Sequence, residues 1–194
     1  DKVKQSIYEG RLWEYVMKKA RAHPKLFEMI EIMTNNYEFF GVTTPKFKEK
    51  AIFLYDKEDQ FRPEVQAYHN MVRKFKSKKK KLIITKESGS KPGYLSHQYV
   101  ELERKFKDFD SIQVCQYNPQ LGLIPIEISD IFPAAHHETS RIDFDPKEFP
   151  TFEKTWRCFF DNNKFLEIHY DKNDKFLKHF VKTLPKEIKK KSIV

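Results

Sequence analysis

Apolar positions along the chain follow two alternating patterns from residue 47 onward. Short runs of consecutive apolar residues are typical of buried strands, and apolar residues that recur every three or four positions are typical of amphipathic helices. The runs predict strands at 51–55, 82–85, 111–117 and 165–170. The helical spacing predicts helices at about 63–75, 97–109, 147–160 and 173–184.

Strands that alternate with helices favour parallel pairing and right-handed crossovers, because each returning helix packs on a face of the sheet. We therefore expect an α/β fold, namely a three-layer α/β/α domain with a mostly parallel four-stranded sheet. The lysine-rich tail, 186–194, is expected to be frayed or cut.

The first 45 residues have a helical pattern and no strand-like run. Residues 2–22 are predicted to form one helix, which ends because Pro24 disfavours helical backbone at the residue before it. Pro24 also suits the first position of a second helix. Gly41 to Pro45 is predicted to be a loop. The expected domains are an N-terminal helical segment, 1–45, and an α/β/α core, 46–194.

Two restrained loops follow the second and third predicted strands. One runs from Glu87 to His97, and the other runs from Asn118 to the paired histidines, His136 and His137. Ligands of open α/β sheets bind beyond the carboxyl ends of the strands, and functional residues gather on such loops. We therefore expect Lys91 and His136 to lie close together in one pocket at that edge.

The segment Ser88 to Gly93 has the composition of a phosphate-binding loop. It follows a strand, precedes a helix and carries one lysine, and backbone N–H groups at a helix start favour an anion. The spacing of a Walker A motif is absent, as is GxGxxG. An ordinary polar turn is an equally good interpretation.

His136 and His137 offer a general base or a metal ligand. A metal site needs three or four ligands, and the nearby candidates are only Glu138 and Asp143. Adjacent histidines in a loop are more often one packed and one solvated. No Gly-x-Ser-x-Gly nucleophile motif is present. We expect neither a metal nor a cofactor.

The charge balance favours a polyanionic partner. Lysine and arginine number 37 against 28 acidic residues, a formal net charge of +9. Such an excess favours nucleic acid, because binding releases counterions from the phosphates. The alternative is a lysine-rich protein with no such partner. The run Lys78 to Lys81 is more simply a solvated strand start than a binding tract, although it adds positive charge near the sheet.

The remaining composition indicates a cytoplasmic protein. The two cysteines, Cys115 and Cys158, are too few for a disulfide framework and are expected to be buried free thiols. No apolar run approaches the roughly 20 residues of a membrane span, and no signal-peptide pattern opens the chain. A start at Asp1 without methionine suggests a fragment or a trimmed chain.

Four stretches, which occur in order, resemble the archaeosine synthase family, the archaeal paralogues of tRNA-guanine transglycosylase. The resemblance covers roughly residues 5–180, and the last stretch, NPQLGLIPIEISDIFPAAHH, is the most specific. The others are EGRLWEYVMKKARAHPKL, RPEV and SGSKP, which begin at Glu9, Arg62 and Ser88.

This resemblance implies a fold, a reaction and partners. The family core is similar to the uracil-DNA-glycosylase-like α/β/α fold. Its reaction adds the amine of free lysine to the nitrile of 7-cyano-7-deazaguanine in tRNA, which gives an amidine on the way to archaeosine. The implied partners are tRNA, free lysine as co-substrate, and other archaeosine-pathway proteins that carry the RNA-binding domain. Such a site needs a basic face, backbone donors and a general base.

The resemblance also assigns candidate site residues. Lys91 and Ser88 would grip phosphate or base, Asn118 and Glu127 would shape the pocket, and His136 would transfer the proton. The catalytic candidates are thus His136, Lys91 and Glu127. The other substrate-binding candidates are Ser90, Ser96, His97, Gly122, Pro125 and His137.

The chain departs from the family at positions that bear on activity. The family Pro-Cys pair is replaced by Lys86-Glu87, and the family arginine by Ile126. These losses favour a non-catalytic tRNA- or partner-binding subunit, whereas the retained Lys91 and His136 favour an active transferase. A base-handling glycosylase follows only from fold analogy. Further departures are Gly93 for tyrosine, Tyr99 for histidine, inserted Gln120, and His137-Glu138 for Tyr-Asp.

Overall fold

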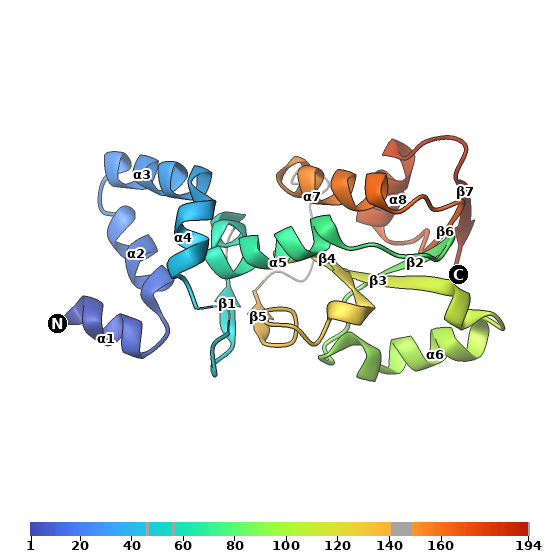
Figure 1. Cartoon of the computed structure of the whole chain (residues 1–194), viewed down its shortest axis with the longest axis horizontal. Helices are drawn as coiled ribbons and strands as arrows, with labels where there is room; N and C mark the ends of the chain where they lie inside the picture. The colour runs from blue at the N-terminus through green and yellow to red at the C-terminus, as the bar shows by residue number, and fades with distance from the viewer. Residues whose placement is uncertain (46, 56, 141–148, 194) are drawn as a thin grey trace.

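The structure, a computed structural model, describes residues 1–45, 47–55, 57–140 and 149–193. Its centre is a five-stranded mixed sheet with the strand order β4-β3-β2-β6-β7 (Figure 1). β2, β3, β6 and β7 are parallel, and β4 pairs antiparallel with β3 at one edge. The strands are β2 (Lys81–Lys86), β3 (Ile112–Asn118), β4 (Gly122–Pro125), β6 (Glu167–Tyr170) and β7 (Lys189–Ser192).

Helices pack on both faces of this sheet (Figure 1). Leu82 and Ile84 of β2 join a large core with α5, α7 and α8, whereas Ile83 between them joins a smaller core with α6. Burial on both faces explains why β2 is one continuous apolar run. The helices are α5 (Pro63–Lys74), α6 (His97–Lys105), α7 (Phe149–Asn162) and α8 (Lys175–Thr183).

The expected α/β alternation is confirmed in its main elements. Strands form at all four predicted runs, three of them, β2, β3 and β6, in the main sheet, and the four predicted core helices occur with ends that differ by a few residues. Residues 147–148, predicted to begin α7, lie outside the described residues. Short 3-10 helices occupy Lys57–Phe61, Gly93–Leu95, Phe109–Ser111 and Ile126–Ile128.

The predicted membership of the sheet is wrong at three strands, because β1 lies outside the main sheet and β7 and β4 belong to it. The run at 51–55 does form a strand, β1 (Ile52–Leu54), but it pairs with β5 (His137–Thr139) in a separate two-stranded parallel sheet. The fourth parallel strand of the main sheet is β7, within the tail expected to be frayed. Backbone hydrogen bonds hold β7, and its side chains are exposed. An apolar pattern therefore cannot reveal it.

The long segment after β3 contains a hairpin that the proline and glycine content concealed. Gly122, with φ +85°, opens β4 opposite Asn118. The Asn118 Oδ1 atom accepts hydrogen bonds from the backbone N–H groups of Gln120 at 2.8 Å and Leu121 at 3.0 Å. This side chain closes the turn locally, as asparagine commonly does.

The N-terminal part contains four short helices in place of the two predicted. The expected single helix at 2–22 breaks at Gly10, whose φ of +70° lies in the left-handed region. Pro24 begins a helix as predicted, but helix continues to Thr43, where a loop was expected. The helices are α1 (Lys2–Tyr8), α2 (Leu12–Ala20), α3 (Pro24–Asn35) and α4 (Tyr37–Thr43).

Buried polar contacts tie these helices to the rest of the chain. Their apolar residues form a small core of their own around Trp13 and Met17. The Trp13 Nε1 group donates to Asp59 at 2.7 Å, and the fully buried Arg62 donates to Glu14 at 2.8 Å. No helix in the described ranges is both long and apolar enough to cross a bilayer.

Candidate functional site

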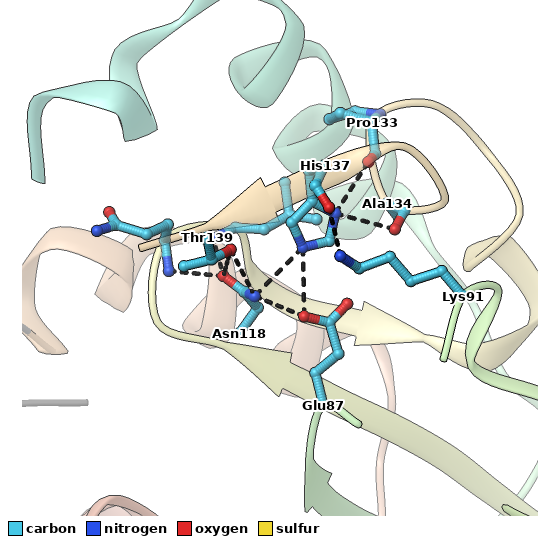
Figure 2. Close-up of polar contacts among 9 residues, drawn as sticks. Glu87, Lys91, Asn118, Pro133, Ala134, His137 and Thr139 are labelled. Carbon is cyan, nitrogen blue, oxygen red and sulfur yellow. Dashed lines mark hydrogen bonds and ion pairs between the residues drawn. The ribbon is translucent and has the colours of Figure 1, made fainter. Parts of the chain in front are cut away.

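A buried imidazole lies where the two loops meet. His137, at the start of β5, has a side chain with no exposed surface. Its Nδ1 atom lies 3.0 Å from the carbonyl oxygens of both Pro133 and Ala134, and its Nε2 atom lies 3.2 Å from Glu87 Oε2 (Figure 2). Carbonyl oxygens only accept, so Nδ1 carries a hydrogen. Nε2 is thereby directed at the carboxylate.

Asn118 fixes the orientation of that carboxylate. Its Nδ2 group donates to Glu87 Oε2 at 2.5 Å and lies 3.2 Å from His137 Nε2 and 3.1 Å from Thr139 Oγ1. Because Asn118 Oδ1 is held by the hairpin turn, its amide cannot rotate without breaking the turn. Glu87, His137, Asn118 and Thr139 form one connected group, hereafter the Glu87 cluster.

Like Thr139, Glu87 is a partly exposed member of the Glu87 cluster. Its side chain is 10% exposed, whereas the His137 side chain is enclosed. The residue follows β2 directly, and its backbone N–H donates to the Tyr117 carbonyl at 2.8 Å. A ligand would therefore meet the carboxylate first, with the imidazole behind it as a partner for a proton. Carboxylate–imidazole pairs of this kind suit general acid–base chemistry.

Lys91 joins the site from the loop after β2. Its Nζ group donates to the backbone carbonyl of His137, which Figure 2 shows beside the Glu87 cluster. A cis peptide bond precedes Pro92 in this loop and another precedes Pro133 in the second loop. The structure thus brings the two loops together through Lys91 and His137.

His136, the expected partner of Lys91, lies outside this group. Its side chain is exposed, and its ring packs edge-on against Phe47 with centroids 6.3 Å apart. Its carbonyl accepts from the Ile52 N–H at 3.0 Å, which starts the β1–β5 pairing. Since β5 directs alternate side chains to opposite sides, only one of two adjacent histidines can point inward. The inward one is His137.

Glu127 lies at the other end of the strands. It accepts from Gln113 at 2.5 Å and lies 3.6 Å from Lys79, both near the amino ends of β3 and β2. Because β4 runs antiparallel to β3, the residues after β4 return to that end. The separation from Asn118 along β3 is about 16 Å, given about 3.3 Å per residue.

The remaining candidates have structural or solvent-exposed positions. Ser96 is buried and caps α6, because its hydroxyl accepts from the Tyr99 N–H at 3.1 Å. That N–H is one of the backbone donors that a phosphate bound at the start of α6 would need. His97 is exposed and lies 3.5 Å from Glu101. Ser90 is exposed, and Ser88 Oγ is buried without a hydrogen-bond partner among the described residues. Gly122 and Pro125 are the ends of β4.

A cavity of about 310 Å³ opens beyond the carboxyl ends of β2 and β6. β2 is followed by α6 on one face and β6 by α8 on the other, so the two adjacent strands mark a topological switch point, where ligands of open α/β sheets bind. The polar side chains that line it include Thr85, Gln98, Glu101, Lys105 and Asp171. The sequence analysis did not predict this cavity, because its position depends on β2 and β6 being neighbours in the sheet, and a local sequence pattern does not give the strand order.

The described residues also bear on two other kinds of chemistry, a nucleophilic thiol and a bound metal. Burial raises the pKa of the Cys115 thiol well above its ordinary value, so it stays protonated. Among the described residues no group of three or more histidine, cysteine or acidic side chains could hold a metal. Of the ligand candidates named from sequence, Glu138 is exposed and Asp143 lies outside the described residues.

Comparison with known proteins gives similarity to archaeal tRNA-guanine(15) transglycosylases. The chain is 28% identical over 138 residues to that of Methanocaldococcus jannaschii and 27% identical over 173 residues to that of Methanococcus maripaludis strain C6. It is 30% identical over 138 residues to that of Pyrobaculum aerophilum. No protein-family model matches the chain, and no solved structure is significantly similar to it.

The similarity covers most of this chain and a small part of each relative. The matched regions include 71%, 89% and 70% of this chain, but only 20%, 24% and 27% of the respective relatives. The chain therefore spans about a quarter of the length of the curated relatives it matches. Its similarity is to one segment of those proteins.

Proposed function

We propose that this chain is a tRNA-modification protein of the archaeosine pathway, built on a segment shared with archaeal tRNA-guanine(15) transglycosylases. The similarity to several such relatives, over most of this chain, carries the proposal. The proposed partner is tRNA, and the proposed location is the cytoplasm. Further proteins of the pathway would supply the RNA-binding domain.

The finer proposal is a synthase-like reaction, the addition of free lysine to the nitrile of 7-cyano-7-deazaguanine in tRNA. The neutral amine of lysine attacks the nitrile carbon, a C–N bond forms, and one N–H proton moves to the nitrile nitrogen to give the amidine. No group leaves. The step needs a base for the amine and an acid for the nitrogen, and one carboxyl group can serve as both in turn.

Glu87 is the residue we assign to that proton transfer. It occupies the position of the family cysteine, and its Oε2 atom is oriented by Asn118 at 2.5 Å and His137 at 3.2 Å. His137 acts as a positioning residue, because its ring is enclosed. The Lys91 ammonium is near enough to the Glu87 cluster to favour negative charge that develops on the nitrile nitrogen.

The cavity beside β2 and β6 is the proposed place for the lysine co-substrate. Glu101 and Asp171 offer carboxylates for its ammonium groups, and Lys105 offers a cation for its carboxylate. Lys86, which precedes Glu87 in the chain, also lines this cavity, so the cavity borders the start of the loop that carries the proposed base.

The proposed architecture is the three-layer α/β/α arrangement of the uracil-DNA-glycosylase-like fold, with residues 1–45 as a helical appendage to a core at 46–194. Helices on both faces of a largely parallel sheet support it. The separate small core of the N-terminal helices supports the treatment of residues 1–45 as an appendage.

Labelled lysine and tRNA that carries the cyano base provide the test. The intact chain should incorporate lysine, and Glu87→Gln, which keeps the size and a hydrogen-bond acceptor, should reduce turnover by about a hundredfold or more. His136→Gln is the matched control and should retain turnover, because its ring lies outside the Glu87 cluster. Equal turnover of the Glu87→Gln variant and the parent would refute the assignment of the base.

The second candidate is a non-catalytic tRNA- or partner-binding subunit of the same pathway. The observation that favours it is the replacement of the family cysteine and arginine by Glu87 and Ile126. It predicts no lysine incorporation by the chain with or without pathway partners, together with tRNA binding that Glu87→Gln leaves unchanged. Incorporation that depends on Glu87 would eliminate it.

A further inference from the structure

The amino end of the parallel sheet gathers lysines from three separate segments. Lys78–Lys81 leads into β2, Lys164 precedes β6, and Lys189–Lys191 belongs to β7. Strand pairing makes them neighbours, because the Lys80 carbonyl accepts from the Leu166 N–H at 2.8 Å and the Leu166 carbonyl accepts from the Lys189 N–H at 2.9 Å. We call these lysines the basic edge.

Few acidic side chains neutralise the basic edge. Lys79 lies 3.6 Å from Glu127, and Lys191 lies 2.9 Å from Glu167. The hydrogen bond from Lys191 lowers the pKa of Glu167, so that carboxylate stays ionised and remains committed to its partner. Lys190 donates to the Leu184 carbonyl at 3.1 Å. The other exposed lysines of the edge have no carboxylate partner in the described part of the chain: Lys78, Lys80, Lys164 and Lys189.

Protection of the sheet against aggregation explains only part of this pattern. Lysines on an exposed edge strand discourage pairing with another chain, and that accounts for Lys189–Lys191 in β7. β2 and β6 are interior strands, paired on both sides. They have no free edge to protect, so the lysines that precede them require another reason.

We propose that the basic edge binds the phosphate backbone of RNA. Unpaired, solvated ammonium groups drawn from several strands match a polyanion, because each phosphate contact releases counterions. The edge lies about 16 to 20 Å from the Glu87 cluster, the length of β3 at about 3.3 Å per residue. The edge would therefore contact the RNA backbone at a distance from Glu87, the proposed general base. The identification of that RNA as tRNA rests on the proposed function.

The test compares two triple variants of equal charge. One replaces a lysine from each segment of the basic edge, Lys80→Gln, Lys164→Gln and Lys189→Gln. The control replaces three exposed lysines of one helix, Lys175→Gln, Lys178→Gln and Lys182→Gln. Circular dichroism establishes that each variant is folded, and fluorescence anisotropy with unmodified tRNA measures Kd over a series of salt concentrations.

The edge variant should bind tRNA about tenfold more weakly near 0.1 M salt, with the slope of log K against log salt reduced by roughly 2 to 3. The control should change Kd by less than about twofold, since it lies off the contact and salt screens it. Equal losses in both variants, or none in the edge variant, would overturn the proposal. Binding to anionic vesicles in place of RNA would overturn it as well.

Failure of this proposal differs from failure of the proposed function. If tRNA binding depends on the basic edge but no lysine is incorporated, the proposed RNA contact is supported and the proposed reaction is refuted. If lysine is incorporated while the edge variant binds tRNA and turns over like the parent, the proposed reaction is supported and the proposed RNA contact is refuted.

Discussion

The two ends of the parallel sheet use charge in opposite ways. At the carboxyl end, the Glu87 cluster is mostly buried, and a hydrogen bond from Asn118 and contact with His137 Nε2 hold its carboxylate. At the amino end, the basic edge is exposed and largely unpaired. A group held in one orientation suits chemistry, whereas mobile solvated cations suit capture of a polyanion. Substitutions should therefore cost stability at the first end and RNA affinity at the second.

The largest effect is expected for His137→Ala. This change removes a fully buried ring and its hydrogen bond to the Ala134 carbonyl, whereas Glu87 keeps its donor Asn118 and the Pro133 carbonyl keeps the His136 N–H. An unsatisfied buried polar group costs about 1–3 kcal/mol, and the cavity left by the buried ring adds to this, so we expect a loss of about 3 kcal/mol in the free energy of unfolding. Urea denaturation measures it. His136→Ala is the control and should lose less than about 1 kcal/mol.

The next effect concerns pH at His69, which supports the hairpin of the same end. Its Nε2–H donates to the Leu121 carbonyl at 2.7 Å, and burial lowers its pKa to about 4 from 6.5. The unfolded chain therefore binds a proton between these values and the folded chain does not. Stability contributed by neutral His69 is present above pH 6.5 and is lost as the pH falls toward 4, by roughly 2–3 kcal/mol.

Urea denaturation of the parent and of His69→Gln across pH 4 to 7 checks this linkage. The glutamine amide can still donate to the Leu121 carbonyl, but it does not titrate. The variant should therefore show a flatter dependence in this window than the parent. Two parallel curves would mean that His69 does not carry the linkage.

A feature could be predicted from sequence where a local pattern of residues determines it, and not where it depends on pairing between distant segments. β2 is buried on both faces, so its apolar run identified it, and Pro24 marked its helix start by backbone restriction. β7 has only lysine and serine side chains, and its pairing rests on backbone groups. β1 had the apolar pattern, yet it pairs with β5 in another sheet, which no local pattern specifies.

The candidate site shows the same division between local and long-range information. The two loops and the carboxyl edge followed from the order of strands and turns. The choice of His137 over His136 depended on the register of β5, and one residue of register reverses which side chain points inward. Glu87 was seen only as a replaced cysteine, because its contacts with Asn118 and His137 join residues 31 and 50 positions apart.

A smaller effect is expected for Asn118→Asp, which places a second negative charge in the Glu87 cluster. The new carboxylate would face Glu87 where the amide now donates at 2.5 Å, and like charges this close repel. We expect a loss of about 1–2 kcal/mol at pH 7, measured by urea denaturation. The loss should shrink below about pH 4, because protonation of the introduced aspartate removes the repulsion. A loss that is constant with pH would point to the hairpin turn alone.

The smallest effect on stability is expected at the basic edge. Lys80→Gln, Lys164→Gln and Lys189→Gln remove exposed ammonium groups that have no carboxylate partner in the described ranges. Exposed substitutions away from such contacts usually change the free energy of unfolding by less than about 0.5 kcal/mol each. Removal of mutual repulsion should make the change slightly favourable at low salt, and that gain should disappear at about 0.5 M salt because the charges are screened. A destabilisation of 2 kcal/mol or more, independent of salt, would show that these lysines hold the sheet together, and the contrast between the two ends would then fail.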